Sequence, residues 1–371
     1  MPRYLTKSRY RMACECPTKL FYTGKKDTYQ DNSLDDPFLN ALRDGGFQVG
    51  ELARQYYEPG TSIDTLNEAE AVQMTDEELK KNEVTIFEAA FLYQNLFIRA
   101  DIVQKKGNSI RLIEVKSGSF DEVKDASFVS SRGKTKGKIK SKWEPTFQDI
   151  AFQTHVVRQA KPGLEVTPFL LLVDKTLLAP VEAMNSYFFL KKCEGSKYPK
   201  VIVTKQIPPV VREREHWILR EIPVEKEVSL IHGDTYDDKS FAERIHGWAE
   251  AYDQDRRIDP VLTKDCRDCQ FRATADERKA GKRSGFHECW NKITGLTESD
   301  LDQPLVLDVW ASTQKNDWIG QKKIKLQDLQ EQDVSEPKKE PEKPGWTRAE
   351  RQRLQIRRVR ERKQEPVVDE K

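Results

Sequence analysis

Three ionisable residues stand in two neighbouring stretches that are otherwise typical of buried strands. Asp101 lies in IRADIV, and Glu114 and Lys116 lie in IRLIEVKSG. Because side chains alternate between the faces of a strand, Glu114 and Lys116 share one face, roughly 7 Å apart. The polar turn at 106–108 would return the first strand alongside the second and bring Asp101 close to Glu114. The sequence therefore predicts two carboxylates and a lysine at one place.

This set of side chains is suited to the hydrolysis of a phosphodiester. Two buried carboxylates repel each other, and a hard cation such as Mg²⁺ or Mn²⁺ compensates that cost because it prefers oxygen ligands. Such an ion polarises a phosphoryl oxygen, and a nearby lysine stabilises the charge that develops on the phosphate. A surface ion pair on an edge strand is the structural alternative. The apolar setting of Glu114 favours the site.

The elements expected around these residues alternate between helix and strand, which predicts an α/β fold. Helical spacing covers residues 34–57, with a break at Gly45-Gly46, and residues 144–159 and 238–255. TDEE at 75–78 resembles a capping box that begins a short helix. Strand patterns are found at 83–92, 95–104, 109–117, 166–174 and 200–207.

The length of 371 residues allows two domains or one large domain with additions. The net charge of +2 favours no particular partner, and no apolar run is long enough for a membrane span. The N-terminus lacks the apolar core of a signal peptide, so we expect a cytoplasmic protein. Composition predicts a main domain at residues 1–295 and a small extension at 296–334. A Pro- and Lys/Glu-rich linker follows at 335–344, and a basic helix that begins at TRAE occupies 345–371.

The pair RADIV and EVKSG, with twelve residues between Asp101 and Glu114, resembles the core motif of the PD-(D/E)XK nuclease superfamily in its RecB-like branch. Ala100 stands where many members have proline. The resemblance implies a mixed sheet flanked by helices, with Asp101, Glu114 and the Val115 carbonyl as metal ligands and Lys116 as the catalytic lysine. It also implies catalytic roles for Glu51, on the preceding helix, and for Gln153, the glutamine of a Q-x-x-x-Y motif whose tyrosine position holds Val157.

Clustered cysteines suggest a metal centre. Cys266 and Cys269 form a C-x2-C pair, Cys289 follows, and a closed tetrahedral site needs a fourth thiolate. One cysteine before the core and three after it resemble the iron–sulfur exonucleases of the same branch, which include CRISPR-associated and AddAB-type nucleases. The resemblance implies a [4Fe–4S] cluster on Cys16, Cys266, Cys269 and Cys289. Such a cluster links the N-terminal end of the nuclease domain to its C-terminal end.

Zinc is the alternative metal, and Cys14 is the alternative first ligand; Cys193 is expected to have no metal role. Residues 5–330 are also similar to an uncharacterised bacterial family that joins such a segment to a further nuclease-like domain. This chain stops before any such domain, so we expect a fragment or a shorter relative.

Two basic segments could contact nucleic acid. RGKTKGKIKSK, directly after the predicted site, could grip a phosphate backbone, although a solvated loop explains it as well. Its basic residues are Arg132, Lys134, Lys136, Lys138, Lys140 and Lys142. The C-terminal basic helix could bind nucleic acid or a protein partner.

These observations favour a metal-dependent DNA nuclease that acts on single strands or ends. One alternative is a catalytically inactive module that binds nucleic acid through the same fold. Another is a structural metal-cluster module of a larger complex.

Overall fold

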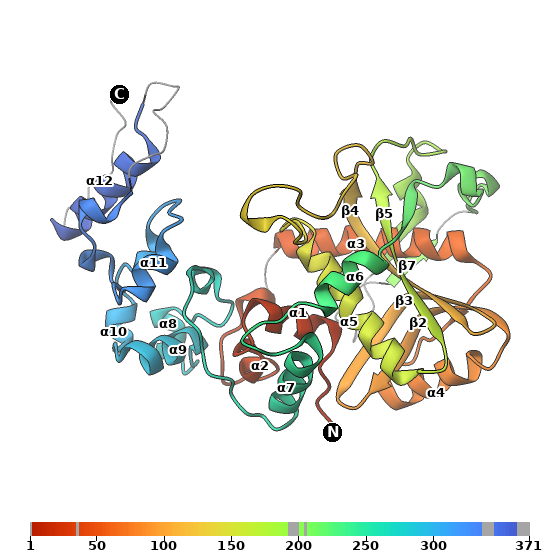
Figure 1. Ribbon diagram of the computed structural model, residues 1–371, viewed down its shortest axis with the longest axis horizontal. Coiled ribbons are helices and arrows are strands. Elements are labelled where there is room, and N and C mark those ends of the chain that lie inside the picture. Colours follow the sequence, from red (N-terminus) through yellow and green to blue (C-terminus); the bar gives the residue numbers. More distant parts are fainter. Residues whose placement is uncertain (1, 35–36, 192–199, 204–205, 336–344, 362–371) are drawn as a thin grey trace. The chain divides into compact units, whose positions relative to one another are not determined.

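The computed structural model describes residues 2–34, 37–191, 200–203, 206–335 and 345–361 (Figure 1). The chain forms two compact units. The first unit comprises Met1–Leu20 and Asp36–Arg257, and the second comprises Phe21–Asp35 and Ile258–Lys371. The division therefore falls near residue 257 rather than at the expected boundary at 295.

A mixed six-stranded sheet forms the centre of the first unit. The neighbouring pairs β1–β2 and β4–β5 are parallel, and the remaining neighbours are antiparallel. The strands expected at 83–92, 95–104, 109–117 and 166–174 are confirmed. In spatial order the sheet contains β1 (Thr61–Ser62), β2 (Glu83–Tyr93), β3 (Leu96–Lys106), β4 (Ser109–Phe120), β5 (Glu165–Asp174) and β8 (Leu219–Pro223).

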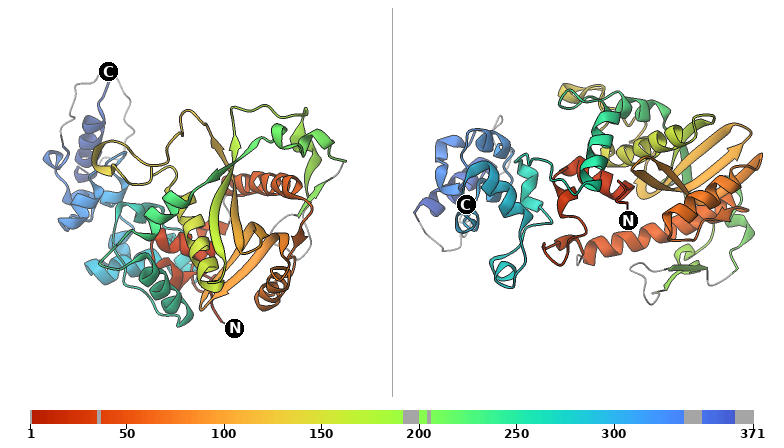
Figure 2. Two further views of the ribbon diagram at one scale, coloured as in Figure 1. Left: turned by 45° about the vertical axis from the view of Figure 1, so that its right-hand side comes forward. Right: turned by 90° about the horizontal axis from the view of Figure 1, so that it is seen from below.

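Helices cover both faces of this sheet, so the first unit is an α/β protein (Figure 2). The helix α5 packs on one face with α1, α6 and α7 around it, whereas α3 packs on the other face. The helix expected at 144–159 is confirmed as α5. The helices of this unit are α1 (Lys7–Glu15), α3 (Pro37–Tyr57), α4 (Glu68–Glu78), α5 (Glu144–Ala160), α6 (Glu225–His232) and α7 (Phe241–Asp253).

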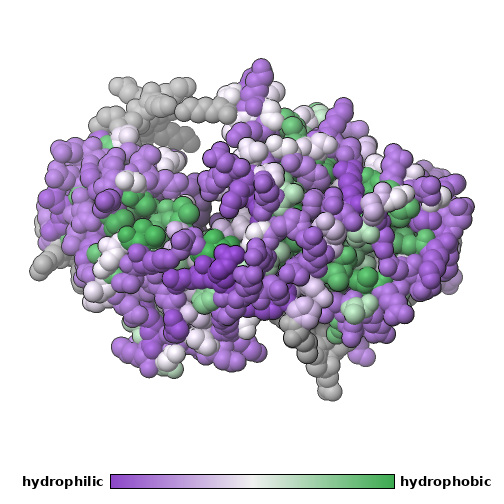
Figure 3. Space-filling model, turned by 60° about the horizontal axis from the view of Figure 1, so that its bottom comes forward, coloured by the Kyte–Doolittle hydropathy of each residue, from purple (hydrophilic) through white to green (hydrophobic). Residues whose placement is uncertain are grey.

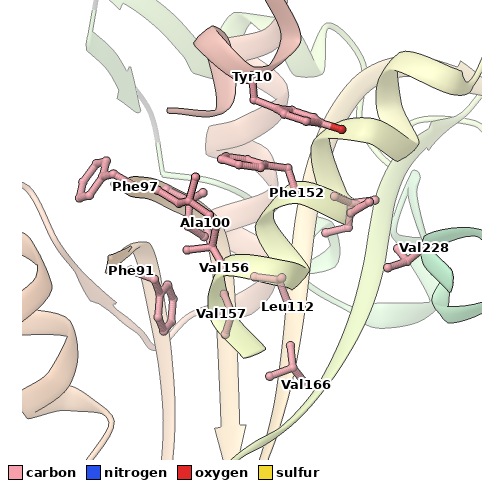
Figure 4. Packing of buried hydrophobic residues seen from close by; sticks show 14 of the residues in the cluster. Tyr10, Phe91, Phe97, Ala100, Leu112, Phe152, Val156, Val157, Val166 and Val228 are labelled. Carbon is pink, nitrogen blue, oxygen red and sulfur yellow. The ribbon is translucent and has the colours of Figure 1, made fainter. Parts of the chain in front are cut away.

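A large cluster of buried hydrophobic side chains packs between α5 and the sheet (Figure 4). Val157, at the position of the expected motif's tyrosine, is completely buried there together with Leu112. A valine at this depth supports packing and offers no polar group. The ring of Tyr10 stacks on Phe152 with centroids 4.5 Å apart, which attaches α1 to α5.

Two local expectations were wrong, and a third was confirmed in part. The helix α3 runs without a break through Gly45-Gly46, because a helical glycine costs only about 1 kcal/mol and the buried side chains of its second half offset that cost. TDEE ends α4 rather than beginning a helix, and Asn67 caps that helix instead. The strand expected at 200–207 is β7 (Lys200–Val203), which pairs with β6 (Phe188–Lys191) in a separate small sheet.

The second unit contains short helices around two hydrophobic clusters. The segment 21–35 belongs to this unit because Tyr29 and its neighbours bind the 270–288 region: the Arg283 amide donates to the Thr28 carbonyl at 2.8 Å, and the Tyr29 hydroxyl donates to Glu288 at 3.1 Å. The helix α2 (Lys19–Tyr22) crosses the boundary in sequence between the units. The helices that follow are α8 (Ala275–Lys279), α9 (Gly285–Thr294), α10 (Glu298–Leu301), α11 (Lys315–Gly320) and α12 (Arg348–Arg360).

The basic C-terminal helix α12 is part of the second unit's core. Thr347 caps it in a capping box, as expected, and Ile356 is completely buried. Gln352 donates to the Trp310 carbonyl at 2.9 Å, and Arg357 pairs with Glu331 at 2.7 Å. This face of the helix is therefore used for packing within the unit. The expected linker at 335–344 lies outside the described residues except for Ser335.

The surface in Figure 3 is mostly hydrophilic, with separate hydrophobic patches. This agrees with a sequence in which 33 % of residues are charged. Among the described residues, the helices are all too short or too polar to cross a membrane.

Candidate active site

Asp101 and Glu114 meet where the ladder between β3 and β4 ends. The last pair of that ladder near the site is Ile102 with Ile113, so Asp101 and Glu114 are the next residues on the two strands. Beyond this pair, the Val115 amide donates to Asp101 Oδ2 at 2.7 Å. A carboxylate side chain thus replaces a main-chain partner, and the two strands open at the predicted site.

Glu114 is the centre of a hydrogen-bond network, although it is only 1 % exposed. Its Oε1 pairs with Lys116 Nζ at 2.8 Å, and its Oε2 accepts a hydrogen bond from Gln153 Nε2 at 2.7 Å. Gln153 lies on α5, four residues after Asp149, so both side chains are on the helix face toward β4. The structure therefore brings together four predicted residues: Asp101, Glu114, Lys116 and Gln153.

The helix α1 contributes two further cations that the sequence analysis did not identify. Lys7 Nζ lies 2.9 Å from Glu114 Oε1 and 3.9 Å from Asp101 Oδ1. One turn later, Arg11 pairs with Asp149 at 3.2 Å. Main-chain bonds between Leu5 and the start of β3, together with the Tyr10 ring stack, hold α1 in this place. The i, i+4 spacing of the two cations is visible in the sequence, but their carboxylate partners lie more than 90 residues away.

These contacts separate the ionisation of the two carboxylates. Burial and the charge of Glu114 raise the pKa of Asp101 from 3.8 to about 7. Burial alone would raise the pKa of Glu114 as well, but the ammonium groups of Lys116 and Lys7 outweigh it and hold that pKa well below its ordinary value. Burial would lower the pKa of Lys7 and of Lys116, yet the surrounding carboxylates raise both. Glu114 is therefore ionised at neutral pH, and Asp101 exchanges a proton near pH 7.

A third carboxylate lies on β2, the strand that pairs with the other edge of β3. Glu88 on β2 is opposite Asp101 between the pairs Phe87–Ile102 and Ala89–Ala100, and its charge adds to the rise of the Asp101 pKa. Its φ of +56° is uncommon for a residue other than glycine, and such conformations concentrate at functional sites. Its carboxylate pairs with Arg54 at 3.3 Å.

Glu51 is not joined to this network. It lies on α3, which packs on the opposite face of the sheet, and its carboxylate accepts a hydrogen bond from Gln55 at 3.0 Å. Within the described residues, no hydrogen bond or ion pair links Glu51 with Asp101 or Glu114. A catalytic role for Glu51 stays a prediction from the resemblance.

The donor atoms at the site fit a hard divalent cation. Asp101 and Glu114 offer carboxylate oxygens, which Mg²⁺ and Mn²⁺ prefer. The amide and carbonyl of one strand residue point to the same neighbouring strand, so the Val115 carbonyl faces the opening beside Asp101, as its amide does. In addition, Asp149 Oδ1 and Gln153 Oε1 are buried oxygens without a hydrogen-bond partner in the described part. The site is thus rich in oxygen acceptors and is balanced by ammonium groups.

The expected basic loop between β4 and α5 is an ordered hairpin. Val129 pairs with Ile139, and the Ser130 amide donates to the Lys138 carbonyl at 2.9 Å. Two buried rings, Phe128 and Trp143, anchor its base with centroids 5.1 Å apart. We call its exposed cations the basic tip, which consists of Arg132, Lys136 and Lys138.

The six cations of this loop are not equivalent. No ion pair occupies the basic tip among the described residues, so its charge faces solvent. Lys142 instead pairs with Asp125 at 3.2 Å and lies over the Trp143 ring, which supports the hairpin. Lys140 is half-buried, and the side chain of Lys134 lies outside the described residues.

Three predicted metal ligands lie in the second unit. Cys266 is within the 3₁₀ turn Lys264–Asp268 and Cys269 follows it directly, while Cys289 lies on α9. All three pack against the same hydrophobic cluster. The Thr263 amide approaches Cys266 Sγ at 3.5 Å, and the Tyr22 hydroxyl lies 3.4 Å from Cys289 Sγ. The sulfur atoms of Cys266 and Cys289 therefore each have a polar neighbour.

The two candidates for a first ligand differ in their surroundings. Cys14 packs against the first unit's core, where burial raises the pKa of its thiol to about 11. A thiol in this state is a poor metal ligand. Cys16 caps the end of α1 and belongs to the first unit, so the complete tetrad stays a prediction. Cys193 lies outside the described residues.

Taken together, the first unit holds an ionised glutamate, an aspartate that titrates near neutrality and two lysines at the opening between β3 and β4. This arrangement can bind a divalent cation and direct an ammonium toward an oxyanion. Comparisons with family models, with curated proteins and with solved structures give no match to this chain.

Proposed function

We propose that the first unit is a metal-dependent nuclease of the PD-(D/E)XK type, acting on DNA strands or ends. The convergence of Asp101, Glu114 and Lys116 where β3 and β4 separate carries this proposal. A buried ion pair alone would need no second carboxylate and no opening between the strands. Here the second carboxylate adds repulsion that a cation relieves.

In this proposal each residue has a defined task. Asp101, Glu114 and the Val115 carbonyl hold the divalent cation, and Gln153 fixes Glu114 through its 2.7 Å hydrogen bond. A bound cation supplies charge stabilisation for the phosphate under attack. Lys116 donates a hydrogen bond to the attacking water or to a phosphate oxygen.

The remaining features support the same function. The basic tip lies in the segment between β4 and α5 and offers three solvent-facing cations to a phosphate backbone. We also propose Cys266, Cys269 and Cys289 as ligands of a structural iron–sulfur or zinc centre, with Cys16 as the predicted fourth ligand.

Cleavage of labelled single- and double-stranded DNA, with Mn²⁺, Mg²⁺ or EDTA, tests the function. We expect cation-dependent cleavage, which Glu114→Ala lowers by roughly 100-fold or more, since the metal's contribution amounts to several kcal/mol. Glu221→Ala is a matched control, because Glu221 is also a largely buried glutamate of the sheet but binds Arg111 and Tyr57 instead.

Two outcomes would contradict the proposal. Cleavage by Glu114→Ala at the wild-type rate would show that the site is assigned wrongly. DNA binding without cleavage by the wild-type protein, under every cation condition, would identify a nucleic-acid-binding module with an inactive fold.

A further inference from the structure

Asp149 is a buried carboxylate that lies directly behind the catalytic lysine. Its side chain is 3 % exposed, and its Oδ2 accepts a hydrogen bond from Lys116 Nζ at 2.5 Å. Arg11 of α1 binds the same oxygen at 3.2 Å. A carboxylate at this depth is costly unless it has cationic partners, and here both partners belong to the site.

The number of donors on Lys116 shows what Asp149 can do. An ammonium group has three N–H donors. Glu114 Oε1, at 2.8 Å, and Asp149 Oδ2, at 2.5 Å, each take one of them from a different element, β4 and α5. Two fixed acceptors determine the direction of the third donor. The Lys116 side chain is 26 % exposed, so it is not fully enclosed by protein.

We propose that Asp149 is a positioning residue, which aims the third N–H donor of Lys116 at the attacking water or at a phosphate oxygen. This inference rests on the proposed nuclease function. Without Asp149, a flexible four-carbon side chain would be held by Glu114 alone, and its ammonium could follow Glu114 when that carboxylate binds a cation. The helix α5 thus keeps the lysine in place independently of the metal ligands.

A purely structural role for Asp149 makes different predictions. Arg11 also donates to the Pro145 carbonyl at 3.2 Å, so the Arg11–Asp149 pair fastens α1 to α5. Loss of this ion pair would lower the stability of the first unit and weaken cleavage in proportion to the folded fraction. Loss of positioning would instead lower kcat in fully folded protein and leave binding intact.

The test compares Asp149→Asn with Asp174→Asn. Asp174 is a matched control because it is also a buried aspartate with a basic partner, Arg220 at 2.7 Å, and it has no contact with the site among the described residues. We expect Asp149→Asn to lower kcat by roughly 10- to 100-fold, with KM and the Mn²⁺ affinity changed less than about twofold. Asp174→Asn should lower stability and keep kcat.

A double mutant makes the test specific to Lys116. If Asp149 acts through Lys116, the variant Lys116→Met/Asp149→Asn should be no slower than Lys116→Met alone. Additive losses would overturn the proposal. Asp149→Glu, which keeps the charge but shifts the carboxylate by one methylene, should give an intermediate kcat and serves if Asp149→Asn fails to fold.

A second measurement needs no cleavage. Acylation of Lys116 by an amine-reactive ester, followed by mass spectrometry of the metal-free protein, should be at least about fivefold faster in Asp149→Asn than in wild type, because a neutral amide carbonyl holds the ammonium more weakly than the carboxylate does. Equal rates would overturn the positioning role. If Lys116 is protected in the wild-type protein but that protein never cleaves DNA, the nuclease function is refuted while the contact between Asp149 and Lys116 is supported. Failure of the proposed function can therefore be distinguished from failure of the positioning role.

Discussion

The substitution Asp101→Asn should make the metal-free protein more stable at alkaline pH, although it removes a candidate metal ligand. Asparagine is nearly isosteric, and its carbonyl can still accept the hydrogen bond from the Val115 amide. What it removes is an ionisation that the folded site opposes, through burial and through the charge of Glu114.

The size of the effect follows from the pKa. An acid whose pKa rises from 3.8 to about 7 on folding destabilises the folded state by roughly 4 kcal/mol once both states are ionised. Because the Asp101 side chain is 27 % exposed, solvent screening reduces this to about 2 kcal/mol. The penalty is absent below the unfolded pKa, grows as the pH rises between the two pKa values, and is complete above the folded pKa.

The assay is thermal unfolding in EDTA at pH 5.5 and pH 8.5. The free energy of unfolding of Asp101→Asn should exceed that of wild type by about 1 kcal/mol at pH 5.5 and by about 2 kcal/mol at pH 8.5. The Tm difference between the two proteins should therefore be larger at pH 8.5 than at pH 5.5, by roughly 2–4 °C. Asp64→Asn, at an exposed carboxylate outside the site, is the control and should show no such trend. An Asp101→Asn variant less stable than wild type at pH 8.5 would refute the reasoning.

Further perturbations test the neighbouring features. Lys7→Met removes the ammonium that binds both candidate metal carboxylates, so the Mn²⁺ dissociation constant measured by calorimetry should fall about tenfold; weaker binding would show that Lys7 assists the cation. Replacement of the basic tip by serine should flatten the salt dependence of single-strand binding by roughly 0.7 in log–log slope per lost phosphate contact, and an unchanged slope would leave it a solvated loop. Cys269→Ser should lower both the metal content of anaerobically purified protein and the Tm of its second unit, whereas Cys14→Ser should change neither; protein without iron or zinc would refute the metal centre.

Several elements of the fold followed from local pattern. The strands around the site were predicted within a few residues because alternating or continuous apolar runs end at clear turns such as 106–108. Patterns failed where tertiary contacts outweighed local preference. Gly45-Gly46 continues a helix because the helix has a sheet face to cover, and β8 was missed because its short sequence, LREIP, becomes a strand only by pairing with β5.

The sequence by itself determined which residues could act at the site on the sheet. Asp101, Glu114 and Lys116 share one place because strand alternation and a short turn leave little freedom, and Gln153 joins them from the next helix. Only the tertiary structure decided that α1 adds Lys7 and Arg11, that Asp149 holds the lysine, and that Glu51 lies apart. Local geometry fixes neighbours a few residues apart, whereas the packing of distant helices depends on the whole core, and no pattern within one element contains that information.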